Sequence, residues 1–168
     1  MRIKSNNRGE VLTISLIFIG IMLSILIFVF SVFMSHVNTI LYNLKIDMYS
    51  LNRSAVIAVN KYKSSIDAFS YDKDAYKTEF IKGLKNNYEL NDSLENKDKL
   101  INKVEIIEYE VYSSNQKDSF TNKRSGTRVL HTVLKVKISP IIMKNFFEDI
   151  FIFTIHEDVA LDSMKTNR

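Results

Sequence analysis

The 168-residue sequence contains no cysteine and only four glycines. The absence of cysteine excludes disulfide bonds and metal sites built from thiolates. Because the four glycines are scattered, no glycine-rich loop for a phosphate is present, and no nucleophile elbow occurs. These absences remove the enzyme classes that short motifs identify most readily. We therefore expect a protein that is not an enzyme, with no catalytic residues and no cofactor.

The positive charge is concentrated at the N-terminus. The formal net charge is +4, and Arg2, Lys4 and Arg8 contribute three of the 23 basic residues. The remaining 20 Lys and Arg nearly balance 19 Asp and Glu, so the basic isoelectric point is weak evidence for nucleic-acid binding. A second basic segment has only Phe120 as an interleaved aromatic residue for stacking on bases. Its basic residues are Lys117, Lys123, Arg124 and Arg128. We do not expect nucleic acid as a partner.

The longest apolar run covers residues 11–34, which are 24 residues without a formal charge. As a helix it would be about 36 Å long, enough to cross a hydrocarbon core of about 30 Å. A secretory signal has a shorter apolar region and a small-residue cleavage site, which "FMSHVNT" does not provide. We therefore predict a retained transmembrane helix over 11–37, after a basic cytoplasmic leader over 1–10. The positive-inside rule then predicts a single-pass protein of the cell membrane with an extracytoplasmic C-terminal head.

The helical pattern continues beyond the apolar run. No glycine or proline lies between Gly20 and Gly83, and apolar residues recur every three or four positions. This spacing predicts that the same helix continues over 38–69, with an apolar face that packs on a globular body. The residues of this face are Val37, Leu41, Leu44, Met48, Leu51, Ala55, Ala58, Tyr62, Ile66 and Phe69, whereas polar residues such as Asn52 lie mostly elsewhere. The alternative is a membrane helix, a short break and a separate helix.

The segment 70–168 has the pattern of an α+β head. A second helix is predicted within 70–90, with Ser70 or Asp72 as its N-cap. Its apolar face is formed by Tyr76, Phe80, Leu84 and Tyr88. Alternating sequences predict strands over 103–112, 127–139 and 150–164, with a long polar hairpin loop over 113–126 and a break at Pro140. The fold class is thus α+β, in which a long N-terminal helix packs on a small antiparallel sheet.

The histidines and acids of the strands are interpreted as structural. His156, Glu157 and Asp158 are consecutive, and adjacent side chains on a strand point to opposite faces, so they do not converge on one ion. We expect this tripeptide to be a solvated part of a strand. His131 lies on the mixed face of its strand and is expected to have no catalytic role. The sequence therefore predicts no metal site.

The junction at Arg8-Gly9, followed by a long apolar helix in "NNRGEVLTISLIF", resembles that of type IV pilin precursors. The closing segment "VLKVKISPIIMKNFFEDIFIFTIHEDVAL" resembles the C-terminal part of the TadE-like pseudopilins of tight-adherence pili. This resemblance implies a pilin-like fold and cleavage after Gly9 by a prepilin peptidase, leaving Glu10 first. It also implies packing of the apolar helix among neighbouring helices. The family has a Glu at the fifth mature position, where this chain has Ile14.

The resemblance and the helix pattern together predict a minor subunit or assembly pseudopilin of a bacterial surface pilus or secretion apparatus. Its partners would be other pilin-like subunits or assembly-platform proteins, the membrane and a prepilin peptidase. The candidate helix-packing residues are Thr13, Ser15, Gly20, Ser24 and Ser31. The alternative function is a signal-anchored extracytoplasmic protein of the cell envelope that binds a partner and does not polymerise. Gly9 and Glu10 would then be a flexible residue before the helix and an acid favoured by the helix dipole.

Overall fold

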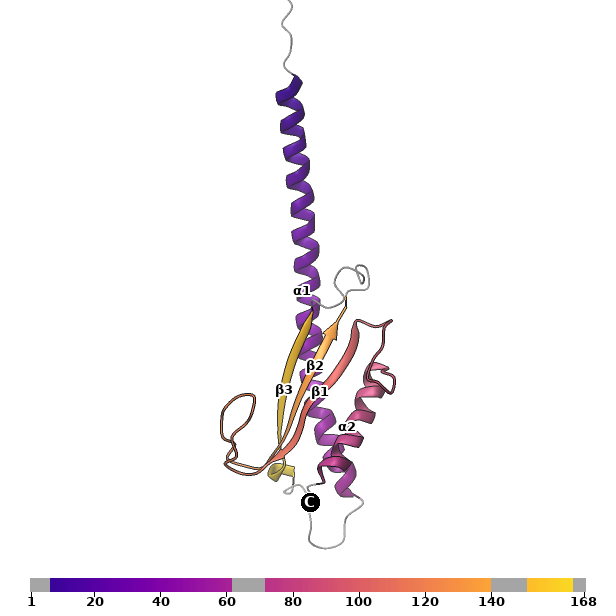
Figure 1. Cartoon of the computed structure of the whole chain (residues 1–168), viewed down its shortest axis with the longest axis vertical. Helices are drawn as coiled ribbons and strands as arrows, with labels where there is room; N and C mark the ends of the chain where they lie inside the picture. Colours follow the sequence, from indigo (N-terminus) through magenta and orange to yellow (C-terminus); the bar gives the residue numbers. More distant parts are fainter. Residues whose placement is uncertain (1–6, 62–71, 140–150, 165–168) are drawn as a thin grey trace, which may run out of the picture. The chain divides into compact units, whose positions relative to one another are not determined.

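The computed structural model describes residues 7–61, 72–139 and 151–164. Its helices are α1 (Asn7–Lys61), α2 (Lys73–Tyr88) and the short 3₁₀ helix η1 (Asp162–Met164). Its strands are β1 (Ile101–Tyr112), β2 (Val129–Ile138) and β3 (Ile152–Ala160), as Figure 1 shows. The chain divides into two compact units, residues 1–40 and 41–168. The elements of the second unit form the predicted α+β head.

Helix α1 runs without interruption from Asn7 to Lys61, a length of 55 residues. This confirms that the helix continues beyond the predicted span, and the alternative of a membrane helix, a short break and a separate helix is wrong. The predicted final part, 62–69, lies outside the described residues. The continuity is expected, because α1 contains no proline and only two glycines, both within its first 14 residues.

Within the second unit, α1 packs through its predicted apolar face. Leu44, Met48 and Ala55 are buried, and each fully buried large side chain contributes about 1.5–3 kcal/mol to stability. Leu51 of α1 lies against Gly83 of α2. A Cβ atom on Gly83 would come within 2.4 Å of Leu51 Cδ2, so the glycine allows the two helices to approach closely. The packing thus explains a glycine that lowers the intrinsic helix propensity of α2.

Helix α2 begins as predicted from its N-cap. The Asp72 carboxylate accepts a hydrogen bond from the Ala75 backbone N–H at 3.0 Å, which confirms Asp72 as the cap, whereas Ser70 lies outside the described residues. The helix ends at Glu89, which adopts the left-handed conformation. Three of the predicted apolar residues, Tyr76, Phe80 and Leu84, are buried. The hydroxyl of the fourth, Tyr88, donates to the Asp47 carboxylate of α1 and so ties the two helices together.

The strands form an antiparallel sheet in the order β1-β2-β3. The register fixes which side chains share a face, because directly paired residues point to the same side. One face is mainly apolar and lies against the helices. For example, the ring centroids of Phe80 on α2 and Tyr109 on β1 are 5.3 Å apart. This helix-facing side carries Val104, Ile106, Tyr109, Leu130, Thr132, Leu134, Ile155 and Val159. The sheet and helices confirm the predicted α+β fold class.

Strand β1 contains a bulge that the sequence does not reveal. Ile106 pairs with Leu134 while Glu108 pairs with Val133, so Ile107 is the extra residue. Strict alternation along this strand would place Ile107 and Tyr109 on one face. The bulge instead leaves the Ile107 side chain exposed and turns Tyr109 toward the helices. As a consequence, Glu108 lies on the outer face of the sheet beside β2.

A polar contact joins α1 to the centre of the sheet. Asn52 is fully buried, and its Nδ2 donates a hydrogen bond to Thr132 Oγ1 at 3.0 Å. The prediction that Asn52 lies off the packed stripe of α1 is wrong, because the residue is buried in the core and its amide N–H donates to β2.

We predict that Thr132→Val lowers the free energy of unfolding by about 1–3 kcal/mol, because it leaves the buried Asn52 amide without its acceptor. The measurement is denaturant unfolding of the full-length protein in detergent micelles, followed by the near-UV circular dichroism of its tyrosines. Thr132→Ser retains the hydroxyl and serves as the control. The double variant Asn52→Leu/Thr132→Val removes both polar partners and should recover most of the loss. A single Thr132→Val variant as stable as the wild type would contradict the structural role of this contact.

Candidate functional site

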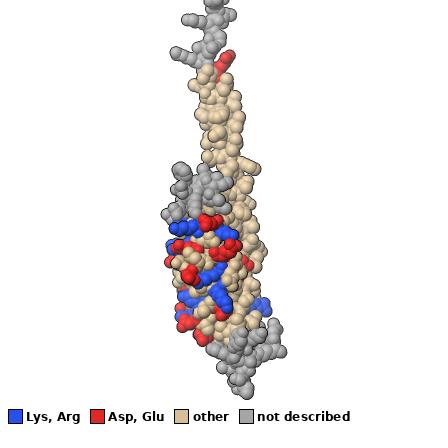
Figure 2. Space-filling model, turned by 90° about the vertical axis from the view of Figure 1, so that its right-hand side faces the viewer, with Lys and Arg blue, Asp and Glu red and all other residues tan. Residues whose placement is uncertain are grey.

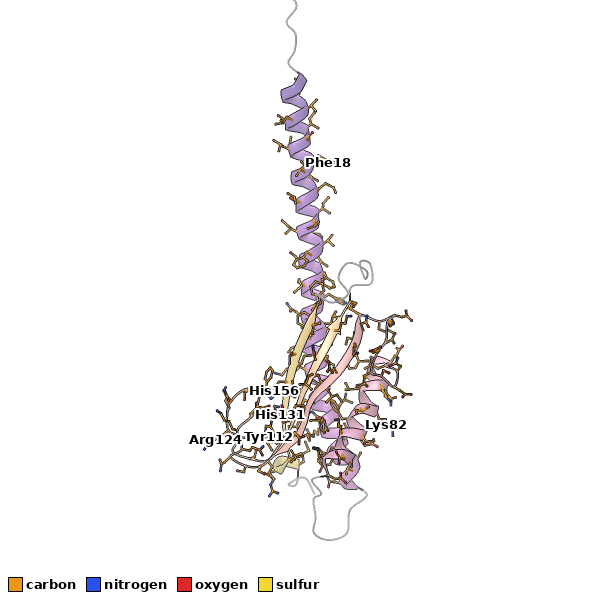
Figure 3. The ribbon with its side chains drawn as sticks, viewed as in Figure 1. Phe18, Lys82, Tyr112, Arg124, His131 and His156 are labelled. Carbon is orange, nitrogen blue, oxygen red and sulfur yellow. The ribbon has the colours of Figure 1, made fainter. Side chains whose placement is uncertain are left out.

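The first candidate site is the apolar surface of α1 in the first unit. The large apolar side chains from Val11 to Val32 are 51% to 69% exposed. Figure 2 shows this stretch of α1 almost without charged residues, and Figure 3 shows Phe18 projecting outward from the helix. Such a continuous apolar surface requires a cover of lipid or of other apolar chains. The helix is long and apolar enough to cross a membrane.

Four of the five predicted packing residues lie on one side of this helix. Thr13, Gly20, Ser24 and Ser31 are separated by seven, four and seven residues, which returns each to nearly the same helical direction. Ser15 lies about 160° away from Thr13 around the axis. We call the four residues the small-residue stripe. Ser15 is not part of it.

The hydroxyl groups of the stripe are satisfied within the helix. Thr13 Oγ1 donates to the Gly9 carbonyl at 2.9 Å, and Ser24 Oγ donates to the Gly20 carbonyl at 2.9 Å. Ser31 Oγ donates in the same way to the Ile27 carbonyl at 2.8 Å. The stripe can therefore enter an apolar environment without unpaired hydroxyl groups. No described heavy atom outside the local helix lies within 4 Å of a Cβ built at Gly20, so this position is open to an approaching helix.

The predicted processing junction lies within α1. The helix begins at Asn7, so Gly9 is already helical and does not form a flexible segment before the helix. Glu10 is exposed in the first turn, where a negative charge is favoured by the helix dipole.

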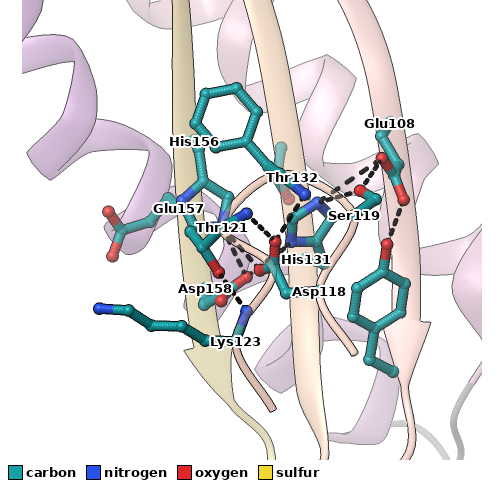
Figure 4. A network of polar contacts seen from close by, with 12 residues as sticks. Glu108, Asp118, Ser119, Thr121, Lys123, His131, Thr132, His156, Glu157 and Asp158 are labelled. Carbon is teal, nitrogen blue, oxygen red and sulfur yellow. Dashed lines mark hydrogen bonds and ion pairs between the residues drawn. The ribbon is translucent and has the colours of Figure 1, made fainter. Parts of the chain in front are cut away.

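The second candidate site is a polar cluster on the outer face of the sheet, opposite the helices. In the register of β2 and β3, His131 pairs with Asp158 and Val133 pairs with His156. His131, His156 and Asp158 therefore share this face. The segment 113–128, which joins β1 to β2, covers the face and adds Asp118 (Figure 4). We call these four residues the His–Asp cluster.

The four polar atoms of the His–Asp cluster alternate between nitrogen and oxygen. His131 Nδ1 lies 2.8 Å from Asp158 Oδ1 and 3.2 Å from Asp118 Oδ2. His156 Nε2 lies 3.1 Å from Asp158 Oδ1 and 3.2 Å from Asp118 Oδ2. All four ligand atoms lie within 4.8 Å of one another. Two imidazoles and two carboxylates thus converge on a single point, an arrangement that can hold a metal ion.

The second carboxylate oxygen of Asp118 fixes the orientation of the first. Asp118 Oδ1 accepts from the backbone N–H groups of Phe120 and Thr121, at 2.7 Å and 2.6 Å. Burial favours a higher pKa for Asp118, but the hydrogen bonds from Thr121 and Phe120, together with His131 and Asp158, lower the pKa to about 2. The carboxylate is therefore ionised, with Oδ2 directed at the imidazoles.

The environment of His131 is also strongly charged. Burial lowers its pKa, but the hydrogen bond to Asp158 and the charges of Asp118, Asp158 and Glu108 outweigh this effect and raise the pKa overall. The negative potential of the cluster thus favours a positive charge at its centre, which a second proton on the imidazole or a bound cation can supply.

A second layer of contacts surrounds the cluster. His131 Nε2 faces Ser119 Oγ at 3.5 Å and Glu108 Oε2 at 3.7 Å. Ser119 donates to Glu108 Oε2 at 2.6 Å, and the Tyr112 hydroxyl donates to Glu108 Oε1. The Tyr112 ring stacks on His131 with a centroid distance of 4.7 Å, and Phe120 stacks on His156 at 5.1 Å (Figure 3 labels Tyr112 and both histidines). The Nε2 side of His131 therefore faces Ser119 and Glu108, and the rings of Tyr112 and Phe120 stack on the two histidines.

The structure corrects the interpretation of the histidines and acids of β2 and β3 as structural or solvated residues that do not converge. The side chain of His156 is only 16% exposed, so the expectation that it is a solvated strand residue is wrong. His131, on the neighbouring strand, is completely buried. The argument that neighbours point to opposite faces holds for Glu157, which approaches Lys45 of α1 on the other side of the sheet. However, His156 and Asp158 are two positions apart on β3 and therefore share a face. The sequence signal was the His-x-Asp alternation in β3 together with a histidine in the adjoining strand.

Comparisons of the chain with protein-family models, with curated proteins and with solved structures find no match.

Proposed function

We propose that the protein is a pilin-like membrane protein, a minor subunit or assembly pseudopilin of a bacterial surface pilus or secretion apparatus. It acts by helix packing and not by catalysis. The observation that carries this proposal is α1 itself. One unbroken helix presents an exposed apolar surface over its first part and contributes buried residues to an α+β head over its last part. The apolar part would lie in the cell membrane, with the N-terminus in the cytoplasm and the head outside.

The small-residue stripe supplies a physical means of association. Within a bilayer, lipid tails are as apolar as leucine, so helices gain little hydrophobic free energy from pairing. Close van der Waals contact is needed instead, and small residues permit it. Gly20 and Ser24 have the small-xxx-small spacing that brings two helix backbones together. The partners of this surface would be the apolar helices of other pilin-like subunits or of assembly-platform proteins.

Two features of the N-terminus bear on the kind of subunit. Cleavage after Gly9 by a prepilin peptidase would make Glu10 the first residue of the mature helix. In the pilin family, a Glu at the fifth mature position pairs with the amine of a neighbouring subunit, but Ile14 has no charge for this pairing. A minor or assembly role therefore fits better than that of a major subunit.

The uncharged Ile14 also supports the second candidate function. A signal-anchored envelope protein that binds a partner through its head and does not polymerise needs no carboxylate within its membrane helix. Its leader would remain attached.

We predict that Gly20→Leu reduces helix association about tenfold, equivalent to about 1.4 kcal/mol, while membrane insertion is unchanged. The added side chain meets no described atom in the isolated chain but blocks close approach of a second helix. Since the chain has no native cysteine, a single Ile17→Cys substitution beside the stripe allows disulfide cross-linking in native membranes to measure association. Ser15→Leu, on the other side of the helix, is the matched control. Equal cross-linking in the Gly20→Leu and Ser15→Leu variants would refute the role of the stripe.

We further predict that the mature protein isolated from its native cells begins at Glu10. Mass spectrometry of the intact chain and of its N-terminal peptide measures this directly. A Gly9→Val variant should retain residues 1–9, because prepilin peptidases of the type IV pilin family cut after glycine. A wild-type protein that retains its leader in cells with an active prepilin peptidase would instead favour the envelope protein that does not polymerise.

A further inference from the structure

From the geometry of the His–Asp cluster we infer that the head binds one divalent transition-metal ion, with Zn²⁺ as the best match, through Asp118, His131, His156 and Asp158. This site is independent of the helix-packing function, and neither proposal requires the other. Its role is structural: the ion would hold the segment 113–128 against strands β2 and β3.

The nitrogen–oxygen distances in the cluster are close to those of a tetrahedral site. With metal–ligand bonds of about 2.0–2.1 Å, neighbouring ligand atoms of a tetrahedron lie about 3.3–3.4 Å apart. The four nitrogen–oxygen distances in the cluster are 2.8 Å, 3.1 Å, 3.2 Å and 3.2 Å. Binding of an ion at the centre would lengthen these four distances by about 0.1–0.6 Å, and the remaining separations, which are no more than 4.8 Å, would adjust toward the same tetrahedral value.

Two buried atoms in the cluster lack hydrogen bonds. Asp118 Oδ2 and His156 Nε2 are buried and make no hydrogen bond to any described residue, although they lie only 3.2 Å apart. Asp118 as a whole is 5% exposed. Buried polar atoms nearly always have a hydrogen-bond partner, because burial of one without such a partner is unfavourable. A metal ion between them would use the lone pairs of both atoms.

The donor set selects the class of ion. Imidazole nitrogen together with carboxylate oxygen favours zinc and its neighbours in the transition series, whereas calcium and magnesium prefer oxygen alone. Two carboxylates and two neutral imidazoles carry a charge of −2, which a divalent ion neutralises. Because four protein ligands already complete a tetrahedron, no position is left for a reacting water molecule, which is typical of a structural site.

The second layer fits a metal-binding histidine. A ligating imidazole usually donates its other N–H to a carboxylate, which fixes the tautomer. His131 presents Nδ1 to the cluster, and its Nε2 lies 3.5 Å from Ser119 Oγ, which in turn donates to the Glu108 carboxylate. Asp118 is held in the same way, because its Oδ1 is occupied by backbone N–H groups and only Oδ2 points inward. The ligands from segment 113–128 and from the sheet are thus oriented before an ion arrives.

The test is metal binding by the full-length protein without an affinity tag in detergent micelles. The chelator-treated protein is titrated with Zn²⁺ by calorimetry, and bound metal is counted by elemental analysis after desalting. We expect one Zn²⁺ per chain and a thermal unfolding midpoint that rises by several degrees with the ion. Co²⁺ should give the intense visible absorption of a tetrahedral site. No binding by the folded wild-type protein, or the weak spectrum of six-coordinate Co²⁺, would overturn the proposal and leave the cluster as ion pairs alone.

Matched variants locate the ion. Asp118→Asn retains an oxygen for the backbone N–H groups but loses the ligand charge, and His156→Gln removes one imidazole. Both should weaken Zn²⁺ binding at least tenfold and abolish the thermal shift. His36→Gln and Asp98→Asn change an exposed histidine and an exposed aspartate outside the cluster and should bind like the wild type. Equal loss in His36→Gln, or unchanged binding in both cluster variants, would refute the assignment. Circular dichroism of each metal-free variant shows whether its fold is retained, and X-ray absorption of the Zn²⁺-loaded wild type should show two imidazole ligands.

Discussion

The head depends on the packing of the C-terminal part of α1 against the sheet and α2. Met48 and Leu44 are buried at this interface. Asn52 adds a hydrogen bond to Thr132, which forms only when the two residues face each other. Apolar contacts tolerate small shifts along the helix, whereas a buried amide that loses its partner costs free energy. The helix is therefore fixed in both rotation and height relative to β2. α2 completes the layer, because Gly83 lets Leu51 approach and Tyr88 reaches Asp47.

The outer face of the sheet is covered by chain rather than by a helix. The segment 113–128 places Ser119 and Phe120 over β2 and β3, and so converts what would be a solvated face into a buried polar layer. This explains why β2 is buried on both faces over its first six residues. A polar layer of this kind needs complete pairing, since unpaired charges in a low dielectric are costly. The His–Asp cluster is where that requirement is concentrated.

The parts of the structure that follow from local pattern could be predicted from the sequence. The spacing of three and four residues predicted the continuation of α1, the side chain of Asp72 predicted the start of α2, and alternation predicted β2. Features that depend on contacts between distant segments could not be predicted. Asn52 looked solvent-facing because its partner lies 80 residues away. The bulge at Ile107 reversed the faces of half of β1, and only the pairing with β2 shows it. The candidate metal site depends on the register of β2 with β3 and on the path of the segment that carries Asp118. The periodicity of the sequence predicts neither of them.

The bulge at Ile107 also affects one of the two edges of the sheet. β1 is an edge strand in the order β1-β2-β3, and its first residues already bond to the preceding segment, where Val104 N–H donates to the Leu94 carbonyl at 2.9 Å. The bulge interrupts the ladder a few residues later. An exposed, regular and flat edge strand can pair with a strand of another chain. The hydrogen bond to Leu94 and the bulge at Ile107 both make the β1 edge less suitable for such pairing. The β1 edge is thereby a poor template for strand addition between two chains, and this lowers the tendency of the sheet to aggregate along that edge.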